Sequence, residues 1–194
     1  MAVKGRAQRH APTVPLRTVG VHPRAVEALR TDVVLTLHQL ERYHAVGRRG
    51  LGHLPFRELQ VYPVYMNTAV SSVERFYALD PRVLERATVS ELGHLAGTAE
   101  IRQQLRARPE QWRVVRRGPV TVPDAQYRPA SGGVVAIEYD TGSYSSQVVK
   151  RKVEAFTLDC TGIVWGAVSA MRRERLQFRY PAVTVLDARW WSRP

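Results

Sequence analysis

A buried strand that leads directly into an amphipathic helix is the feature that most constrains the fold of this 194-residue chain. Residues 134–137 form an unbroken apolar run, the pattern of a buried strand, and a Thr-Gly-Ser turn follows at 141–143. Residues 145–160 then place apolar side chains at helical spacing. These side chains are Val149, Val153, Phe156 and Cys160. Because such a strand and helix must each bury an apolar face, the segment predicts a layered α/β or α+β domain.

Three carboxylates stand at the ends of two successive predicted strands. Residues 120–124 alternate between two faces of a strand and end on Asp124, whereas Glu138 and Asp140 end the following strand and share one face. If the two strands pair as a hairpin, the three acids meet, and this oxygen-rich cluster suits Mg2+ or Mn2+ bound against a phosphate. The alternative is that the carboxylates are solvated or form salt bridges, as acids at strand ends commonly do.

A lysine on the predicted helix is within reach of these acids. Lys152 lies three residues after Val149 and four before Phe156, so it flanks the apolar face of the helix. From there its ammonium group could neutralise negative charge that develops on a phosphate. The alternative is an ordinary helix lysine whose stem covers apolar surface while its charge stays in water.

The remaining segments complete a predicted mixed sheet. From residue 90 onward the expected order is helix, three strands, helix, strand, helix, strand, which fits a central mixed sheet flanked by helices. Upstream, residues 24–46 have the spacing of one long amphipathic helix or two short ones, and residues 73–79 alternate as a strand. We therefore expect three parts: a flexible basic arm (1–23), a helical region (24–88) and an α/β domain (89–194).

The charge of the chain favours a polyanionic partner. Lys and Arg number 29 against 17 Asp and Glu, which leaves a formal charge of +12. Such an excess favours a nucleic acid, with an acidic protein partner or a codon bias toward arginine as alternatives. The predicted phosphate contacts are Arg42, Arg48, Arg49, Arg57, Arg116, Arg117, Lys150, Arg151, Arg172 and Arg173. A lone cysteine, the lack of an apolar span and the lack of a signal sequence predict a cytoplasmic protein that does not associate with a membrane.

Several short motifs follow one another in a fixed order between residues 90 and 156. The sequence Pro-Asp-Ala at 123–125 precedes a strand that ends in E-x-D-x-G at 138–142, and a helix follows with Lys152 four residues before an aromatic side chain. Upstream, His94 stands in an L-x-H context and is followed by an E-x-R step at 100–102. Together these motifs resemble those of the replication-relaxation proteins, which occur on bacterial plasmids and other mobile elements. The resemblance covers residues 90–156, about a third of the chain, and implies a protein associated with the nucleoid or a plasmid.

The resemblance implies a PD-(D/E)xK nuclease-like fold in the C-terminal part. In that fold, Asp124 and Glu138 would hold the catalytic metal, and Glu100 would supply a further acid. Asp140 stands where active nucleases of this class have a lysine, and Lys152 would be its displaced replacement. The resemblance also implies a winged helix-turn-helix in the N-terminal region, with residues 77–81 as the wing, although no recognition helix can be placed between 51 and 71.

Two functional hypotheses follow from these predictions. In the first, the protein binds DNA in plasmid replication, mobilisation or DNA processing, and its nuclease-like domain has lost catalysis. In the second, it is a Mg2+- or Mn2+-dependent endonuclease that nicks DNA through Asp124 and Glu138, with Asp140 and Lys152 assisting. An RNA-binding or partner-docking adaptor is a weaker third reading. The oligomeric state is open, with a homodimer as one alternative.

Overall fold

The computed structural model describes residues 20–64, 71–115 and 121–191. Most of the predicted basic arm therefore falls outside the described residues, as do Arg116 and Arg117. Within the described ranges, no helix is long and apolar enough to cross a membrane.

The C-terminal half of the described chain is built on a mixed sheet with the order β4-β5-β6-β7-β8. The neighbouring pairs β4-β5 and β5-β6 are antiparallel, whereas β6-β7 and β7-β8 are parallel. This arrangement confirms the predicted mixed sheet and the predicted order of elements from residue 90 onward. The strands are β4 (Trp112–Val114), β5 (Ala125–Tyr127), β6 (Val135–Asp140), β7 (Gly162–Ala167) and β8 (Thr184–Asp187).

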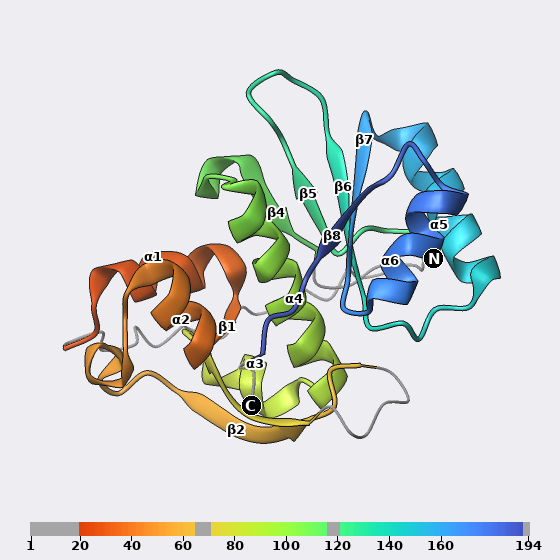
Figure 1. The fold of residues 1–194 in the computed structure, drawn as a ribbon. Coiled ribbons are helices and arrows are strands. Elements are labelled where there is room, and N and C mark those ends of the chain that lie inside the picture. Colours follow the sequence, from red (N-terminus) through yellow and green to blue (C-terminus); the bar gives the residue numbers. More distant parts are fainter. Residues whose placement is uncertain (1–19, 65–70, 116–120, 192–194) are drawn as a thin grey trace, which may run out of the picture.

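Helices cover both faces of this sheet. Figure 1 shows α5 (Ser146–Asp159) and α6 (Ala170–Arg179) together beside β6, β7 and β8. The long helix α4 (Val89–Leu105) packs against β6 and β7 as well. Because successive side chains of β6 point to opposite faces, Tyr139 faces α4, whereas Glu138 and Asp140 face α5 and α6. Both acids are therefore placed beneath a helical layer.

The turn between β6 and α5 is encoded locally, as the sequence predicts. Gly142 has a φ of 97°, a backbone conformation that L side chains rarely adopt, so a glycine suits this turn. The side chain of Ser145 then accepts a hydrogen bond from the backbone N–H of Val148, which caps the first turn of α5. A glycine turn and a serine cap together fix where the strand stops and the helix begins.

The N-terminal part forms a second, antiparallel sheet with the order β1-β3-β2 in the described residues. Residues 24–46 form two short helices, as one of the two predicted alternatives had it, and a short strand lies between them. The predicted strand at 73–79 is confirmed as β3. The elements are α1 (Pro23–Asp32), β1 (Val34–Thr36), α2 (Leu37–His44), the 3-10 helix η1 (Arg48–Leu51), β2 (Phe56–Val61), β3 (Ser72–Ala78) and α3 (Pro81–Arg86); a second 3-10 helix, η2 (Pro109–Gln111), precedes β4.

Helix α4 joins the two sheets into one packed body. It crosses the middle of the molecule in Figure 1 and contacts β1 and β2 on one side and β6 and β7 on the other. The largest group of buried apolar side chains includes Phe76 and Val34 of the first sheet and Ile137, Tyr139 and Val164 of the second. The sequence regions on the two sides of the predicted boundary, between residues 88 and 89, thus share one hydrophobic core.

The predicted strand at 120–124 is not formed in its described residues, 121–124. Residue 121 is in a turn, residues 122 and 124 are bends, and β5 begins at Ala125, so Asp124 precedes its strand instead of ending one. The alternation in the sequence predicts a strand here, but Pro123 has no N–H group to donate to a ladder at this position. The strand therefore begins only after the proline and the aspartate.

Candidate functional site

A buried ion pair forms the centre of the candidate site. The Lys152 ammonium nitrogen lies 2.9 Å from Glu138 Oε1, and the two side chains are 6% and 0% exposed. The Tyr144 hydroxyl donates a hydrogen bond to the same Glu138 oxygen over 3.0 Å, and Lys152 lies 5.2 Å from the centre of the Tyr144 ring. Lys152 therefore reaches the end of β6, as the sequence predicts, but it is fully enclosed there.

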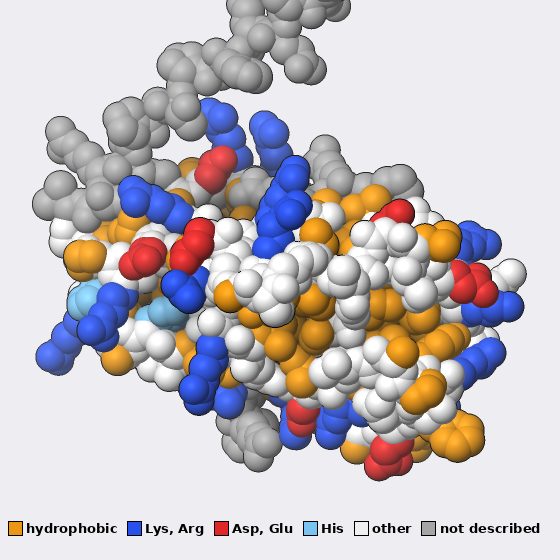
Figure 2. Space-filling view, turned by 90° about the horizontal axis from the view of Figure 1, so that it is seen from above, with side chains coloured by type: hydrophobic (Ala, Val, Ile, Leu, Met, Phe, Trp, Pro, Cys, Tyr) orange, Lys and Arg blue, Asp and Glu red, His pale blue; other side chains and the backbone are white. Residues whose placement is uncertain are grey.

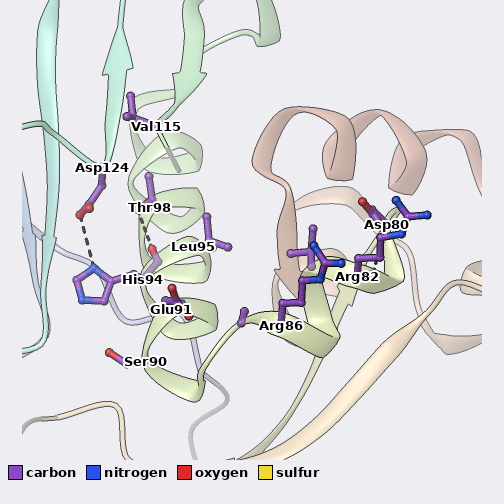
Figure 3. Close-up of a pocket in the computed structure, with 12 residues that line it drawn as sticks. Asp80, Arg82, Arg86, Ser90, Glu91, His94, Leu95, Thr98, Val115 and Asp124 are labelled. Carbon is purple, nitrogen blue, oxygen red and sulfur yellow. Dashed lines mark hydrogen bonds and ion pairs between the residues drawn. The ribbon is translucent and has the colours of Figure 1, made fainter. Parts of the chain in front are cut away.

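Asp124 approaches the same site from the next strand. The antiparallel pairing of Ala125 with Ile137 places Asp124 opposite Glu138. One oxygen of the Asp124 carboxylate accepts a hydrogen bond of 2.8 Å from the backbone N–H of Tyr139. The same oxygen lies 3.7 Å from His94 Nδ1 on α4, a contact drawn in Figure 3. Both Asp124 and His94 are 25% exposed, so this end of the site, unlike Glu138, opens to solvent.

The environment of Glu138 strongly disfavours its ionised form. Burial is the largest influence and the negative charge of Asp124 is the second, and together they raise the pKa of Glu138 from 4.5 to about 8. Lys152 and Tyr144 act in the opposite direction without offsetting the burial. The second carboxylate oxygen, Oε2, is buried and has no hydrogen-bond partner among the described residues. The site thus contains an unsatisfied carboxyl oxygen beside a second acid.

This pKa shift predicts a pH-dependent stability. Between about pH 5 and pH 8, the unfolded chain releases the Glu138 proton while the folded protein retains it. The free energy of unfolding should therefore fall as the pH rises through this window, by at most about 1.4 kcal/mol per pH unit, and level off above it. Urea denaturation at a series of pH values measures the slope, and the double variant Glu138→Gln/Lys152→Met, which lacks both groups, serves as the control. If wild type and control have parallel profiles, the pKa of Glu138 is not raised.

Asp140 belongs to a separate ion pair. Nε and Nη2 of Arg172 on α6 donate hydrogen bonds to Asp140 Oδ2 over 3.0 and 2.8 Å. The backbone N–H of Gly142 donates to Oδ1, and the Trp165 indole N–H lies 3.4 Å from Oδ2. Asp140 is completely buried, so Arg172 neutralises its charge inside the fold. Asp140 at the end of β6 is thus matched by an arginine from α6.

Glu100 lies in a different hydrogen-bond network. Its carboxylate accepts hydrogen bonds from Tyr43 and Gln39 of α2 and from Gln104 of its own helix. Arg42 Nη1 is 3.5 Å from the same carboxylate, although the Arg42 side chain is half exposed. Glu100 therefore fastens α2 to α4.

The predicted metal ligands are divided among these three environments. Across residues 20–64, 71–115 and 121–191, no three His, Cys, Asp or Glu side chains gather in a way that could hold a metal ion. Two of the predicted ligands, Asp124 and Glu138, do lie near each other, and Oε2 of Glu138 has no hydrogen-bond partner among the described residues. Metal binding thus stays a prediction, and it depends on these two carboxylates.

The predicted phosphate-binding cations also differ in their surroundings. Arg48, Arg49 and Arg151 are exposed, and Lys150 is exposed beside Glu154. Others are engaged within the fold. Arg57 donates hydrogen bonds to the carbonyl oxygens of Leu84 and Ala87, Arg172 pairs with Asp140, and Arg173 pairs with Asp187. The sequence does not distinguish the exposed cations from the engaged ones, because each engaged arginine contacts a partner that is distant in the sequence.

A groove opens beside Asp124 and His94, and the sequence did not predict it. It has a volume of about 730 Å3 and lies between α3 and α4. Its charged and titratable lining residues are Asp80, Arg82, Arg86, Glu91, His94 and Asp124, most of which are drawn in Figure 3. Its formation requires α3 and α4 to be held at a set distance, a property that local sequence patterns do not record.

A protein-family model described as Replication-relaxation matches residues 69–157. The matched segment extends from just before β3 into α5 and includes His94, Asp124, Glu138 and Lys152. It therefore confirms the predicted resemblance and lengthens it toward the N-terminus by about 20 residues. No curated protein and no solved structure matches the chain. The family match supports a function related to plasmid replication or mobilisation.

Proposed function

We propose that this protein binds DNA during the replication or mobilisation of a plasmid or a similar mobile element, and that its nuclease-like domain serves in binding. The observation that carries the proposal is the excess of positive charge, +12 over the chain, on a protein whose segment 69–157 matches the replication-relaxation model. A protein that neutralises several phosphates at once releases counterions, which drives association with DNA.

The distribution of charge on the surface supports this proposal. Figure 2 shows Lys and Arg side chains around the rim of one face, in larger number than Asp and Glu. Arg48 and Arg49 are exposed on η1, and Lys150 and Arg151 are exposed on the first half of α5. Cations on several separate elements can contact a long polyanion at several points, whereas a small acidic ligand would need them close together.

The state of the acids supports binding over cleavage. Glu138 is paired with Lys152, Asp140 is paired with Arg172, and both carboxylates are fully buried. These contacts join α5 and α6 to the sheet, and the raised pKa of Glu138, about 8, disfavours the ionised carboxylate that a metal would need. The C-terminal domain would thus retain a nuclease-like architecture, with a central mixed sheet, as a scaffold for basic side chains.

The N-terminal part is proposed to be a modified winged helix. Its order of helix, strand and helix, followed by the β2-β3 hairpin, supports this assignment. The 3-10 helix η1 stands where a recognition helix would follow α2, and it carries Arg48 and Arg49. Such a short element would contact the DNA backbone more readily than it would read bases in the major groove.

A second candidate function, metal-dependent nicking, is favoured by one observation. The Oε2 atom of Glu138 is buried and has no hydrogen-bond partner in the described part of the chain, and Asp124 lies near enough to raise the Glu138 pKa. These two carboxylates would hold Mg2+ or Mn2+, which supplies an activated water molecule and offsets phosphate charge when it is bound. Lys152 would hold Glu138 in place, and the Asp124 side would face the DNA because it is the more exposed of the two.

One experiment compares the two functions. Purified protein is incubated with supercoiled plasmid in Mg2+, in Mn2+ or in EDTA, beside the variants Asp124→Asn and Glu138→Gln. We expect wild type and both variants to retard the plasmid in a gel under all three conditions, with non-specific dissociation constants on the order of 1–100 μM. We also expect the plasmid to remain supercoiled, because the acids are paired within the fold.

Two outcomes would change this conclusion. Nicking that requires a metal and disappears in both variants would establish the nuclease instead. Absence of retardation in wild type would overturn the proposal of DNA binding altogether. Circular dichroism of the variants confirms that any lost activity does not reflect unfolding, and the same titration with single-stranded RNA tests the adaptor alternative.

A further inference from the structure

We propose that the groove between α3 and α4 is the path of a DNA strand to the Asp124 end of the site, and that Arg82 and Arg86 hold the phosphate backbone of that strand. The proposal rests on the proposed function, because it presupposes that the protein binds DNA. It assigns binding roles to two arginines that the sequence patterns did not single out.

The first argument is access. Glu138 and Lys152 are 0% and 6% exposed, so DNA cannot reach them directly. Asp124 and His94 are 25% exposed, and both line the groove. A phosphodiester that approaches the site would therefore meet the His94 and Asp124 side chains first, from the groove side.

The second argument is the availability of positive charge. Arg82 and Arg86 lie four residues apart on α3, hence on one side of this helix, and both line the groove. Within the described part of the chain, neither guanidinium group has an ion pair or a side-chain hydrogen bond, and both residues are exposed. Figure 3 shows them on α3, with the Asp124 and His94 pair on the far side of α4. Free guanidinium groups present planar donors that match phosphate oxygens.

The third argument is the rigid placement of these arginines. Nη1 of Arg57 on β2 donates hydrogen bonds of 3.0 Å to the carbonyl oxygens of both Leu84 and Ala87 at the end of α3. These carbonyl groups have no partner within the helix, so Arg57 acts as a C-terminal cap. Arg57 is a predicted phosphate contact, and its Nη1 atom is engaged by these two carbonyl groups. It instead positions the helix that presents Arg82 and Arg86.

Two of the acidic side chains that line the groove stabilise the starts of helices. Asp80 caps α3 by accepting a hydrogen bond from the backbone N–H of Arg82. The Glu91 carboxylate accepts hydrogen bonds from the backbone N–H and the hydroxyl of Thr88 at the start of α4. Both carboxylates thus face helix ends, where backbone N–H groups offset part of their charge. Of the three described acids that line the groove, Asp124 is the one that lies where the proposed DNA path reaches the candidate site.

The test compares two double variants that remove the same amount of charge. Arg82→Ala/Arg86→Ala alters the groove, and Arg24→Ala/Arg30→Ala removes two exposed arginines from α1. Fluorescence anisotropy with a labelled DNA duplex and with a labelled single strand, over a range of salt concentrations, gives the affinity and its salt dependence. The thermal unfolding of each variant is recorded, and both should unfold like wild type because the altered side chains are exposed.

We expect the groove variant to bind DNA about tenfold more weakly than wild type and the α1 variant to change little. The slope of log K against log salt should decrease in magnitude by about 1.8 on duplex DNA in the groove variant, since two phosphate contacts are lost. Equal affinity losses in the two variants would overturn the inference and leave DNA binding intact. If wild type itself fails to bind DNA, the proposed function falls with it. The same titration with a labelled single-stranded RNA completes the test: weakened binding of RNA but not of DNA in the groove variant would likewise overturn the inference.

Discussion

Replacing Asp32 with alanine is expected to destabilise the protein by about 3–5 kcal/mol, among the largest effects of any single substitution. Nε and Nη2 of Arg102 donate hydrogen bonds to the two oxygens of Asp32, each over 2.6 Å. The side chains are 8% and 0% exposed, so removal of the carboxylate leaves a buried guanidinium group with no counter-charge. For a chain of this size, the melting temperature should fall by on the order of 10 °C.

The measurement is thermal and urea denaturation of Asp32→Ala, Arg102→Met and the double variant Asp32→Leu/Arg102→Met. The double variant removes both charges and fills the space with apolar groups, so it should recover much of the stability lost in Asp32→Ala. If Asp32→Ala unfolds like wild type, or if the double variant is no more stable than the single one, the pair does not tie α1 to α4. We expect the loss of this ion pair to disturb the candidate site as well, because α4 carries His94.

The second large effect is expected from Gly97→Ala. A Cβ atom at this position would lie 2.3 Å from two ring carbons of Tyr139, far inside van der Waals contact. The Tyr139 ring cannot retreat easily, because it is fully buried and its hydroxyl accepts a hydrogen bond of 2.7 Å from the Trp190 indole N–H. We expect a loss of about 1–3 kcal/mol or more from overpacking, even though alanine favours the helix by about 1 kcal/mol.

Gly93→Ala is the matched control on the same helix. Its Cβ would lie 3.2 Å from a Trp190 ring carbon, a contact that a small shift can relieve. The two substitutions share the same gain in helix propensity, so the difference in their free energies of unfolding isolates the clash with Tyr139. Equal stabilities of the two variants would show that α4 and β6 can separate without loss. Because Asp124 accepts a hydrogen bond from the Tyr139 N–H, a displaced β6 should also disturb the candidate site.

Much of the C-terminal fold could be predicted because its signals are local. The apolar run before Glu138, the glycine turn and the serine cap of α5 are short patterns with one favoured backbone outcome. The reach of Lys152 to the end of β6 follows from helix periodicity in the same unit. By contrast, the alternation at 120–124 predicts a strand that does not form, because Pro123 has no N–H group to donate to a ladder.

The candidate site was only partly predictable for the same reason. Asp124 and Glu138 meet because β5 and β6 pair in antiparallel register, which a hairpin reading anticipated. Asp140 and Arg172 meet although 32 residues separate them, and only the packing of α6 on the sheet brings them together. Three acids that look alike in sequence thus have different roles once neighbouring helices supply their partners.

The sequence by itself determined the α/β alternation of the C-terminal half, the excess of positive charge and the family resemblance, since these depend only on residue order and composition. The tertiary structure decided which charged side chains form ion pairs or hydrogen bonds inside the fold and which face solvent. Arg57 caps α3, whereas Arg82 and Arg86 beside the groove have no ion-pair partner among the described residues. The physical reason is that an ion pair or a cap depends on distances between elements, and those distances are set by how the elements pack around α4.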